Sequence, residues 1–317
     1  MDRNLALEFV RVTEAAAIAA AQWVGRGDGK AADGAGVDEM RDRFNQIDFS
    51  GTVVIGEGEK DEAPKLFTGE KVGTGKGPEM DLAVDPVEAT DSVAFGRYNA
   101  LSVIVAGAKG SLLHAPDTYM NKIACGQAAA KKIDLDAPVK DNISQVAKAL
   151  GKEISEITVV VLDRERHRDL ITEIRKTGAR VRLITDGDMA AMVAACLPDT
   201  GVDLVLGIGG STEAVLAAAP VKLLGGQVLC RFTPRSDDDK REIISCLNEA
   251  GISDINQRFD AEMLAKGRQL TFTATGIIDG PLLAGVRYHQ GVIITHSIVI
   301  RSISGTIRYI TTHHKNT

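Results

Sequence analysis

Cysteine is scarce in this sequence, and no zinc-type arrangement of cysteine or histidine occurs. The 317 residues include four cysteines without a CxxC pair and six scattered histidines. This usage indicates reduced thiols, as in cytoplasmic proteins, rather than a disulfide framework. No run approaches the ~18 apolar residues that span a bilayer, and charged residues interrupt the stretch before "AAAIAAA" at helical spacing. We therefore expect neither a signal sequence nor a membrane partner.

An excess of basic residues is also lacking. Lys and Arg total 37 against 43 Asp and Glu, so the formal net charge is -6 at pH 7. Nucleic acid binding usually needs a clustered basic face, so no nucleic acid partner is expected, whereas acidic clusters can bind cations. Internal repeats and low-complexity tracts are absent too. The length exceeds the ~100–200 residues typical of one domain, which predicts two domains.

The hydrophobic pattern changes along the chain. Residues 1–156 combine an amphipathic N-terminal helix, a helix over 34–47 and apolar runs typical of strands, which indicates an α+β domain. From residue 157 on, three β-branched runs alternate with helical segments, as in parallel β-α-β units. We predict an α/β fold with an α+β first domain, 1–156, and an α/β second domain, 157–317. The placement of 225–317 stays open.

Several acidic residues continue apolar faces or follow strand-like runs. They are Asp33, Glu57, Glu59, Asp81, Asp85, Glu88 and Glu213. Taken singly, each is more often an exposed surface residue. Unpaired charges on apolar faces are costly, however, and hard cations such as Mg²⁺ or Mn²⁺ bind oxygen ligands. The spacing of "AVDPVEAT" also lets two carboxylates bind metal while the hydroxyl of Thr90 orients water.

Polar residues follow three successive strands predicted in the second domain, at the end where parallel sheets bind ligands. They are Arg164 and Arg166, then Asp186 and Asp188, then Gly210 and Glu213. Arginine forks suit phosphate oxygens, carboxylates accept hydrogen bonds from sugar hydroxyls, and a helix opening at "GIGGST" can bind an anion. The arginines could instead pair with Glu165, and "GIGG" could be turn chemistry or part of a dinucleotide fingerprint.

Seven segments together resemble the class II fructose-1,6-bisphosphatases of bacteria. They are "GDGKAADGAGVDEM", "VIGEGEKDEAP", "AVDPVEAT", "APDTYMNKI", "DRERH", "ITDGD" and "GIGGSTEA", in matching order over nearly the whole chain. This family belongs to the lithium-sensitive, metal-dependent phosphatases that include inositol monophosphatases. The resemblance implies a layered αβαβα sandwich of the sugar phosphatase type and a cytoplasmic homodimer or homotetramer. It also implies Mg²⁺- or Mn²⁺-dependent hydrolysis of the 1-phosphate of fructose 1,6-bisphosphate, in gluconeogenesis or glycerol metabolism.

The resemblance also implies roles for individual residues. Asp33 and Glu57 match ligands of one metal, and Asp85, Glu88 and Glu213 match ligands of the other. Thr90 matches the catalytic hydroxyl that helps activate water, with Asp33 as the nearby proton acceptor. The matched contacts of the sugar bisphosphate are Glu88, Ala89, Thr90, Tyr119, Arg164, Glu165, Arg166, Asp186, Gly187, Asp188 and Gly210.

The sequence departs from the family pattern at two places. Ala89 replaces a glycine, and Thr212, Glu213 and Ala214 replace Pro-Glu-Gly. If position 89 or 214 needs a positive φ, the Cβ costs on the order of 1 kcal/mol. Ser211 or Thr212 could serve as a helix cap in place of the proline. We therefore expect an active enzyme that is slower or shifted in substrate preference.

Three alternatives remain open from the sequence. The same chemistry could act on sedoheptulose 1,7-bisphosphate or an inositol phosphate. A catalytically weak sugar phosphate binding protein is a second possibility, with Ala89 marking lost activity. A dinucleotide-dependent oxidoreductase ranks low, because the full glycine fingerprint and its acidic partner are missing.

Overall fold

The computed structural model describes residues 5–58 and 65–315, in two compact units. Unit 1 comprises Met1–Leu112 and Gly267–Thr317, and unit 2 comprises Leu113–Lys266. These division points differ from the predicted boundary between residues 156 and 157. Residues 113–156 contribute a strand to the sheet of unit 2, and the C-terminal strands pair with the sheet of unit 1. Local hydrophobic patterns contain no information on such long-range pairing.

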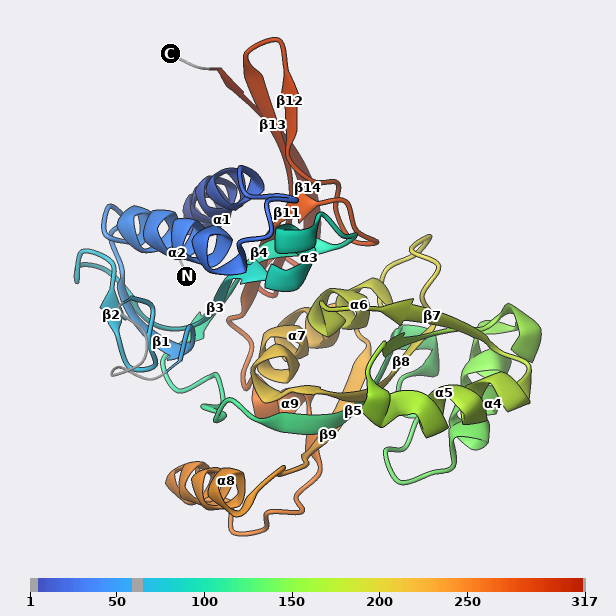
Figure 1. The fold of residues 1–317 in the computed structure, drawn as a ribbon. Helices are drawn as coiled ribbons and strands as arrows, with labels where there is room; N and C mark the ends of the chain where they lie inside the picture. The colour runs from blue at the N-terminus through green and yellow to red at the C-terminus, as the bar shows by residue number, and fades with distance from the viewer. Residues whose placement is uncertain (1–4, 59–64, 316–317) are drawn as a thin grey trace. The chain divides into compact units, whose positions relative to one another are not determined.

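Unit 1 is built on an eight-stranded sheet of order β12-β13-β11-β4-β3-β1-β2, with β14 paired to β13 (Figure 1). Its strands are β1 (Ser50–Ile55), β2 (Lys71–Val72), β3 (Glu79–Glu88), β4 (Ala100–Ala108), β11 (Thr271–Ile278), β12 (Arg287–His289), β13 (Val292–Arg301) and β14 (Thr306–Lys315). Its helices are α1 (Leu5–Ala21), α2 (Gly29–Phe44) and α3 (Thr90–Phe95). Strands β1 and β3 are parallel, and the other pairs that β3, β4, β11 and β13 form are antiparallel.

Helices α1 and α2 pack against one face of this sheet. The rings of Phe9, Phe44 and Phe49 meet edge to face, with centroids 5.5 to 6.1 Å apart. Such edge-to-face geometry stabilises a core beyond the area that it buries. The stripe predicted for the second helix is confirmed for Val37, Met40 and Phe44, which are buried, whereas α2 starts and ends earlier than the predicted 34–47, so Ile47 is buried in the turn after it. The predicted inward face of the first strand is confirmed for Val53 and Ile55, whereas Glu59 lies outside the described residues.

Helix α1 also places a carboxylate against the sheet. Glu14 is only 4% exposed, and its Oε1 accepts hydrogen bonds from the hydroxyls of Thr295 at 3.2 Å and Thr312 at 2.6 Å. One residue earlier, the hydroxyl of Thr13 lies 2.7 Å from that of Thr275. These bonds satisfy a charge that would be costly to bury alone, and they join α1 to the C-terminal strands.

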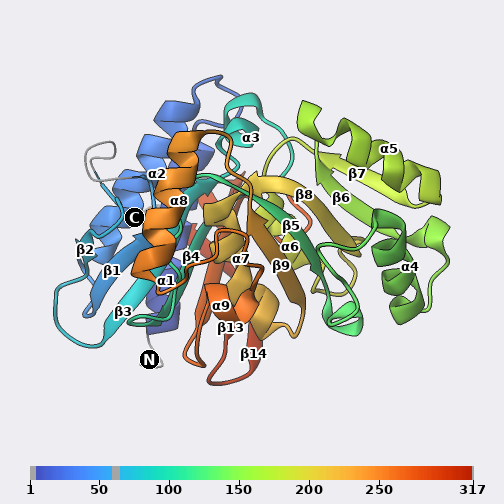
Figure 2. The same cartoon turned by 90° about the horizontal axis from the view of Figure 1, so that it is seen from below.

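Unit 2 contains a six-stranded sheet of order β10-β9-β5-β8-β6-β7. Its strands are β5 (Tyr119–Cys125), β6 (Thr158–Leu162), β7 (Arg180–Ile184), β8 (Leu204–Gly210), β9 (Gln227–Phe232) and β10 (Phe259–Asp260). Its helices are η1 (Gln127–Ala129), α4 (Val139–Leu150), η2 (Ile154–Glu156), η3 (Glu165–His167), α5 (Arg168–Thr177), α6 (Asp188–Ala194), α7 (Ser211–Leu223), α8 (Asp237–Glu249) and α9 (Ala261–Leu264). Helices α4 and α5 lie on one side of the sheet, and α6 and α7 lie on the other (Figure 2).

The mixed α/β fold class with two sheets is confirmed. Strands β6, β7 and β8 are parallel, as the β-α-β pattern predicts. The helix expected near residues 238–250 is α8, and the strands expected within 270–313 are β11, β13 and β14. Strands β5 and β9, antiparallel to one another in the centre of the second sheet, were not anticipated. In the part of the chain that the structure describes, no helix is long and apolar enough to cross a bilayer.

The hydroxyls around Glu14 lead to a test of stability. Thr312→Val removes a donor from a buried carboxylate, so we expect a loss of about 1–3 kcal/mol in the free energy of unfolding. Thr311→Val is the matched control, because Thr311 is exposed on the same strand. Urea unfolding of both variants measures the difference. Equal stability of the two variants would contradict the role given to Glu14.

Candidate active site

The first group of candidate site residues lies in unit 1, where the parallel strands β1 and β3 end. Ile55, the last residue of β1, pairs with Ala83 of β3, and Glu57 follows β1 closely enough for the charge of Asp85 to act on it. The chain bends at Gly56, just before Glu57, and passes close to the backbone of Leu66. A Cβ on Gly56 would lie 1.9 Å from the carbonyl oxygen of Leu66. The amide of Glu57 donates to that carbonyl at 3.0 Å. The close approach of the backbone at Gly56, which leaves no room for a side chain, therefore fixes the position of Glu57.

Helix α2 brings Asp33 to the same segment. A Cβ on Gly29 would lie 3.2 Å from Cγ2 of Thr90, and one on Gly36 would lie 2.7 Å from Cγ2 of Val87. These glycines let α2 approach residues 86–90 closely. Asp33 lies four residues after Gly29 and three before Gly36, so it shares their face of the helix. The carboxylate of Asp28 caps α2 by accepting from the amide of Ala31 at 3.0 Å.

The segment from Asp85 to Thr90 is held by its own hydrogen bonds. The amide of Val87 donates to Oδ1 of Asp85 at 3.1 Å, and the hydroxyl of Thr90 donates to the carbonyl of Val87 at 3.0 Å. The ladder with β4 changes register between Asp85 and Glu88. Glu88 is 2% exposed at the end of β3, and Thr90 begins α3. The strand end therefore gathers two carboxylates and a hydroxyl.

Burial and neighbouring acids shift the pKa values of Glu57 and Asp33. Burial raises the pKa of Glu57 well above its ordinary value, and the charges of Asp85 and Asp33 raise it further. Burial also raises the pKa of Asp33, which a hydrogen bond from Glu57 partly offsets. The side chains of Asp33 and Glu57 are hydrogen-bonded to one another, and two carboxylates side by side cannot both ionise cheaply. We call Asp33, Glu57, Asp85 and Glu88 the carboxylate cluster.

The carboxylate cluster fits a hard metal ion by its chemistry. Among the described residues, no group of three or more His, Cys, Asp or Glu side chains could hold a metal ion as it stands. Burial and two neighbouring carboxylates nevertheless all oppose the charge of Glu57, and a divalent cation would counter these effects together. Oxygen-only ligands suit Mg²⁺ or Mn²⁺. Asp81 does not join the cluster, because Oδ2 of its side chain accepts from the amides of Gly110 and Leu112.

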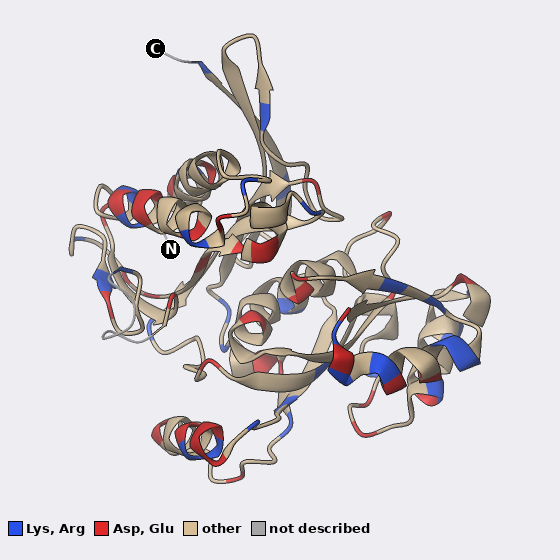
Figure 3. Ribbon diagram, viewed as in Figure 1, with Lys and Arg blue, Asp and Glu red and all other residues tan. Residues whose placement is uncertain are grey.

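The second group of candidate residues lies in unit 2, where β6, β7 and β8 end. We call it the polar rim: Tyr119, Arg164, Arg166, Asp186, Asp188, Gly210 and Glu213. The three strands are parallel, so their carboxyl ends share one edge of the sheet. Tyr119 begins the antiparallel strand β5 and pairs with Gly210, which brings it to the same edge. Acidic residues open α6 and α7 there (Figure 3).

The aromatic ring of Tyr119 contacts two arginines of the rim. The guanidinium of Arg166 lies 4.5 Å from the ring centroid, and that of Arg235 lies 4.7 Å from it. Arg166 also donates from Nε and Nη2 to the carbonyl of Ile208, which fixes its fork. Glu165 forms an ion pair with Arg168. The alternative in which Glu165 pairs with Arg164 or Arg166 is therefore not observed.

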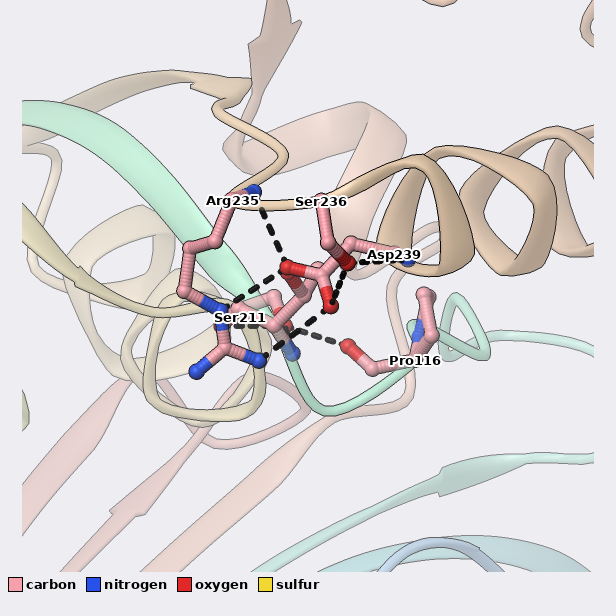
Figure 4. Close-up of polar contacts among 6 residues, drawn as sticks. Pro116, Ser211, Arg235, Ser236 and Asp239 are labelled. Atoms are coloured by element: carbon pink, nitrogen blue, oxygen red, sulfur yellow. Dashed lines mark hydrogen bonds and ion pairs between the residues drawn. The ribbon is translucent and has the colours of Figure 1, made fainter.

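Arg235 was missed by the sequence analysis. It follows β9, which runs parallel to β8 because both are antiparallel to β5. The carboxyl end of β9 therefore lies at the same edge of the sheet as those of the other strands, where ligands are expected to bind. Its amide and Nε donate to Oδ2 of Asp239 at 3.0 and 2.8 Å, and the hydroxyl of Thr118 donates to the same oxygen (Figure 4). Recognising β9 as a strand would have identified Arg235.

The predicted cap of α7 is wrong. Gly210 is the N-cap residue, and no side chain caps the helix. The hydroxyl of Ser211 instead donates to the carbonyl of Pro116 and accepts from the amide of Thr118 at 3.0 Å, which joins α7 to the start of β5 (Figure 4). The hydroxyl of Thr212 donates to Oε2 of Glu213 at 2.9 Å. These hydroxyls therefore position the loop before β5 and the carboxylate of Glu213 rather than cap the helix.

A buried lysine beneath the rim was also missed. Lys122, in the middle of β5, is 2% exposed, and its Nζ lies 2.8 Å from Oδ2 of Asp188. Burial raises the pKa of Glu213, while the charge of Lys122 lowers it and that of Asp188 raises it. A lysine between Met120 and Ala124 in a buried strand was the available signal, but β5 itself was not anticipated.

His167 connects the strands that carry the rim. Its Nε2 accepts from the amide of Ile208 at 2.7 Å, so its Nδ1 carries the proton and donates to the carbonyl of Leu162 at 2.8 Å. Burial lowers the pKa of His167 from its ordinary 6.5, and nearby Arg166 and Arg164 lower it further. The neutral imidazole therefore joins the carboxyl end of β6 to β8.

Comparison with known proteins identifies the family of this chain. A family model described as "Bacterial fructose-1,6-bisphosphatase, glpX-encoded" matches residues 3–314. The chain belongs to this bacterial fructose-1,6-bisphosphatase family. The fructose-1,6-bisphosphatase 1 class 2 of Escherichia coli (strain K12) is 44% identical over 99% of this chain and 96% of its own length.

Two further proteins are similar to this member of the bacterial fructose-1,6-bisphosphatase family. The "D-fructose 1,6-bisphosphatase class 2/sedoheptulose 1,7-bisphosphatase" of Synechococcus sp. (strain JA-2-3B'a(2-13)) is 43% identical over 99% of this chain and 96% of its own length. A solved inositol monophosphatase from Anabaena (Nostoc) sp. PCC 7120 is 12% identical, with a TM-score of 0.33 over 78% of this chain and 96% of that chain. That score is too low to support an inference.

The two departures from the bacterial fructose-1,6-bisphosphatase pattern differ in backbone conformation. Ala89 has φ 73° and ψ 54°, in the left-handed region that favours glycine. Ala214 lies inside α7 and is not among the residues with positive φ. A positive φ, which strains a residue that has a Cβ, is therefore found at position 89 and not at position 214.

This difference predicts unequal effects of two glycine substitutions. Both Ala89→Gly and Ala214→Gly remove a buried methyl group, but only the first removes left-handed strain, while the second weakens a helix. Ala89→Gly should leave the protein more stable than Ala214→Gly by at least about 1 kcal/mol. Denaturant unfolding measures both, and an equal loss would mean that Ala89 is not strained.

His167 predicts a loss of stability in mild acid. Its folded pKa lies below the unfolded one, so its contribution is present above pH 6.5 and is lost as the pH falls through the folded value. The urea midpoint of wild type should therefore decrease when the pH is lowered from about 7.5 to about 5.5, and the midpoint of His167→Leu should decrease less. The exposed His313→Leu is the control and should behave as wild type. A steeper fall in His167→Leu would refute the assignment.

Proposed function

We propose that this chain is a fructose-1,6-bisphosphatase that hydrolyses the 1-phosphate of fructose 1,6-bisphosphate to fructose 6-phosphate and phosphate. The observation that supports it most is the carboxylate cluster, in which Glu57, Asp85 and Asp33 act on one another, while α2, which carries Asp33, packs closely against Thr90. Membership of the bacterial fructose-1,6-bisphosphatase family supports the identity of the sugar. The cluster alone supports metal-assisted hydrolysis of a phosphate ester.

Asp33, Glu57, Asp85 and Glu88 would hold the metal. Bound Mg²⁺ or Mn²⁺ would polarise the phosphate and lower the pKa of a bound water. Thr90 donates its own proton to the carbonyl of Val87, so its oxygen can accept a hydrogen bond from a water and orient it. Asp33, held on α2 in the same cluster, would accept the proton that the water gives up. Glu213 as a further ligand stays a prediction.

The polar rim would bind the sugar bisphosphate. Arg164 would offer a planar fork to the phosphate that is not hydrolysed, and Arg166, whose Nε and Nη2 donate to Ile208, would offer its remaining N–H groups. Asp186 and Asp188 would accept hydrogen bonds from sugar hydroxyls, and Gly187, with φ 81°, provides the turn between them. The amide of Ser211, the first of α7, donates to the carbonyl of Thr118 at 2.9 Å, so an anionic oxygen would have to bind the amides after it. Glu165, exposed and paired with Arg168, has the weakest support among the predicted contacts.

The family resemblance also supports wider proposals. We propose Mg²⁺ or Mn²⁺ as the cofactor, a cytoplasmic homodimer or homotetramer, and a role in gluconeogenesis or glycerol metabolism. The double name of the Synechococcus relative favours sedoheptulose 1,7-bisphosphate as a second candidate substrate. Phosphate release from this ester, from inositol 1-phosphate and from fructose 1,6-bisphosphate ranks the three candidates. Binding of the sugar phosphates without turnover under any metal condition would instead favour a binding protein.

Thr90 provides the sharpest test of the catalytic proposal. Thr90→Val keeps the shape of the side chain but cannot orient water, so kcat should fall about 100-fold or more, while Thr90→Ser retains most activity. Phosphate release from fructose 1,6-bisphosphate with Mg²⁺, with Mn²⁺ and with chelator measures both variants against wild type. Activity that survives chelation, or a Thr90→Val variant as fast as Thr90→Ser, would refute the proposal.

A further inference from the structure

The ion pair between Lys122 and Asp188 is placed where an ion pair is expensive. Lys122 is 2% exposed in a central strand of the sheet of unit 2, and Asp188 is 8% exposed. Desolvation of two buried charges often cancels their attraction, so apolar residues of similar size would serve stability equally well. A buried ion pair that does not improve stability points to a role in the polar rim beside it.

The backbone around the pair is shaped to admit it. A Cβ on Gly209 would lie 2.1 Å from Oδ2 of Asp188 and 3.0 Å from Nζ of Lys122. Strand β8 can therefore pass the ion pair only with glycine at this position. In the next residue, a Cβ on Gly210 would lie 1.9 Å from Oε2 of Glu213. The glycine pair thus makes room for both carboxylates of the rim.

The contact with Lys122 is made by one oxygen of Asp188. Its Oδ2 accepts from Nζ of Lys122, and Asp188 is the first residue of α6, where the N-terminus also favours a negative charge. A carboxylate with one oxygen fixed by a buried ammonium cannot rotate freely, so Oδ1 is presented in one direction. That orientation is what a sugar hydroxyl needs in order to donate to it.

We propose that Lys122 is a positioning residue for the sugar, acting through Asp188. This inference rests on the proposed function, because it assumes that Asp188 accepts a hydrogen bond from the substrate. Lys122 itself needs no contact with the substrate. Loss of its ammonium would free the Asp188 carboxylate and leave it without its cation, which would weaken substrate binding more than the chemical step.

The experiment compares wild type with Lys122→Met, Asp188→Asn and the double variant, by initial rates of phosphate release from fructose 1,6-bisphosphate with Mg²⁺. Lys122→Met should raise KM roughly 10- to 100-fold with a much smaller change in kcat. The double variant should be no worse than Asp188→Asn alone, because residues that act as one unit are not additive. The double variant also removes the unpaired buried carboxylate, which guards against a loss of folding in Lys122→Met.

The control is Lys152→Met. Lys152 forms an ion pair with Asp203 at 2.6 Å, and these residues lie just before β6 and β8, away from the rim. Lys152→Met should leave KM unchanged. If wild type is active and Lys122→Met keeps the wild-type KM, or if the effects of Lys122→Met and Asp188→Asn simply add, the inference is wrong. A wild type that releases no phosphate would overturn the proposed function and this inference with it.

Discussion

Repulsion among buried carboxylates is the constraint on which the rest of unit 1 depends. Glu57 follows β1 and Asp85 lies near the end of the parallel strand β3, close enough for their charges to interact, and α2 adds Asp33 to them. No fold gains stability from acids arranged in this way, because each raises the cost of ionising the next. Under the proposed function, a bound cation would offset this cost.

The backbone of unit 1 accepts further costs to hold these acids together. Gly56 turns where any side chain would meet the carbonyl of Leu66, and Gly29 and Gly36 give up helix propensity so that α2 can approach Val87 and Thr90. At Ala89 the chain keeps a left-handed conformation although a methyl group opposes it. Strain that persists at one residue while its neighbours are held by hydrogen bonds is typical of functional sites.

Local pattern predicted much of this site, and long-range pairing limited the rest. The acids of the carboxylate cluster follow apolar runs, and the rim residues follow β-branched ones, so periodicity and strand-end rules found both groups. Lys122 and Arg235 were missed because β5 and β9 were not recognised, and their pairing partners lie far away in sequence. The division of the chain was placed differently for the same reason. Strain at position 89 could be stated from sequence only as a condition, since φ depends on the surrounding fold.

The two units offset buried acids in different ways. In unit 2 the cation is a side chain of the protein, because the ammonium of Lys122 lies against Asp188. Strand β8 passes this ion pair closely, with a glycine, Gly209, at the point of contact. Among the described residues of unit 1, the effects that raise the pKa of Glu57 are burial and other acids, which a divalent ion from solution would counter under the proposed function. A built-in ammonium keeps a carboxylate fixed at all times, which suits recognition of a neutral hydroxyl. A divalent ion from solution adds charge and Lewis acidity that no side chain provides, which suits the bond that is broken.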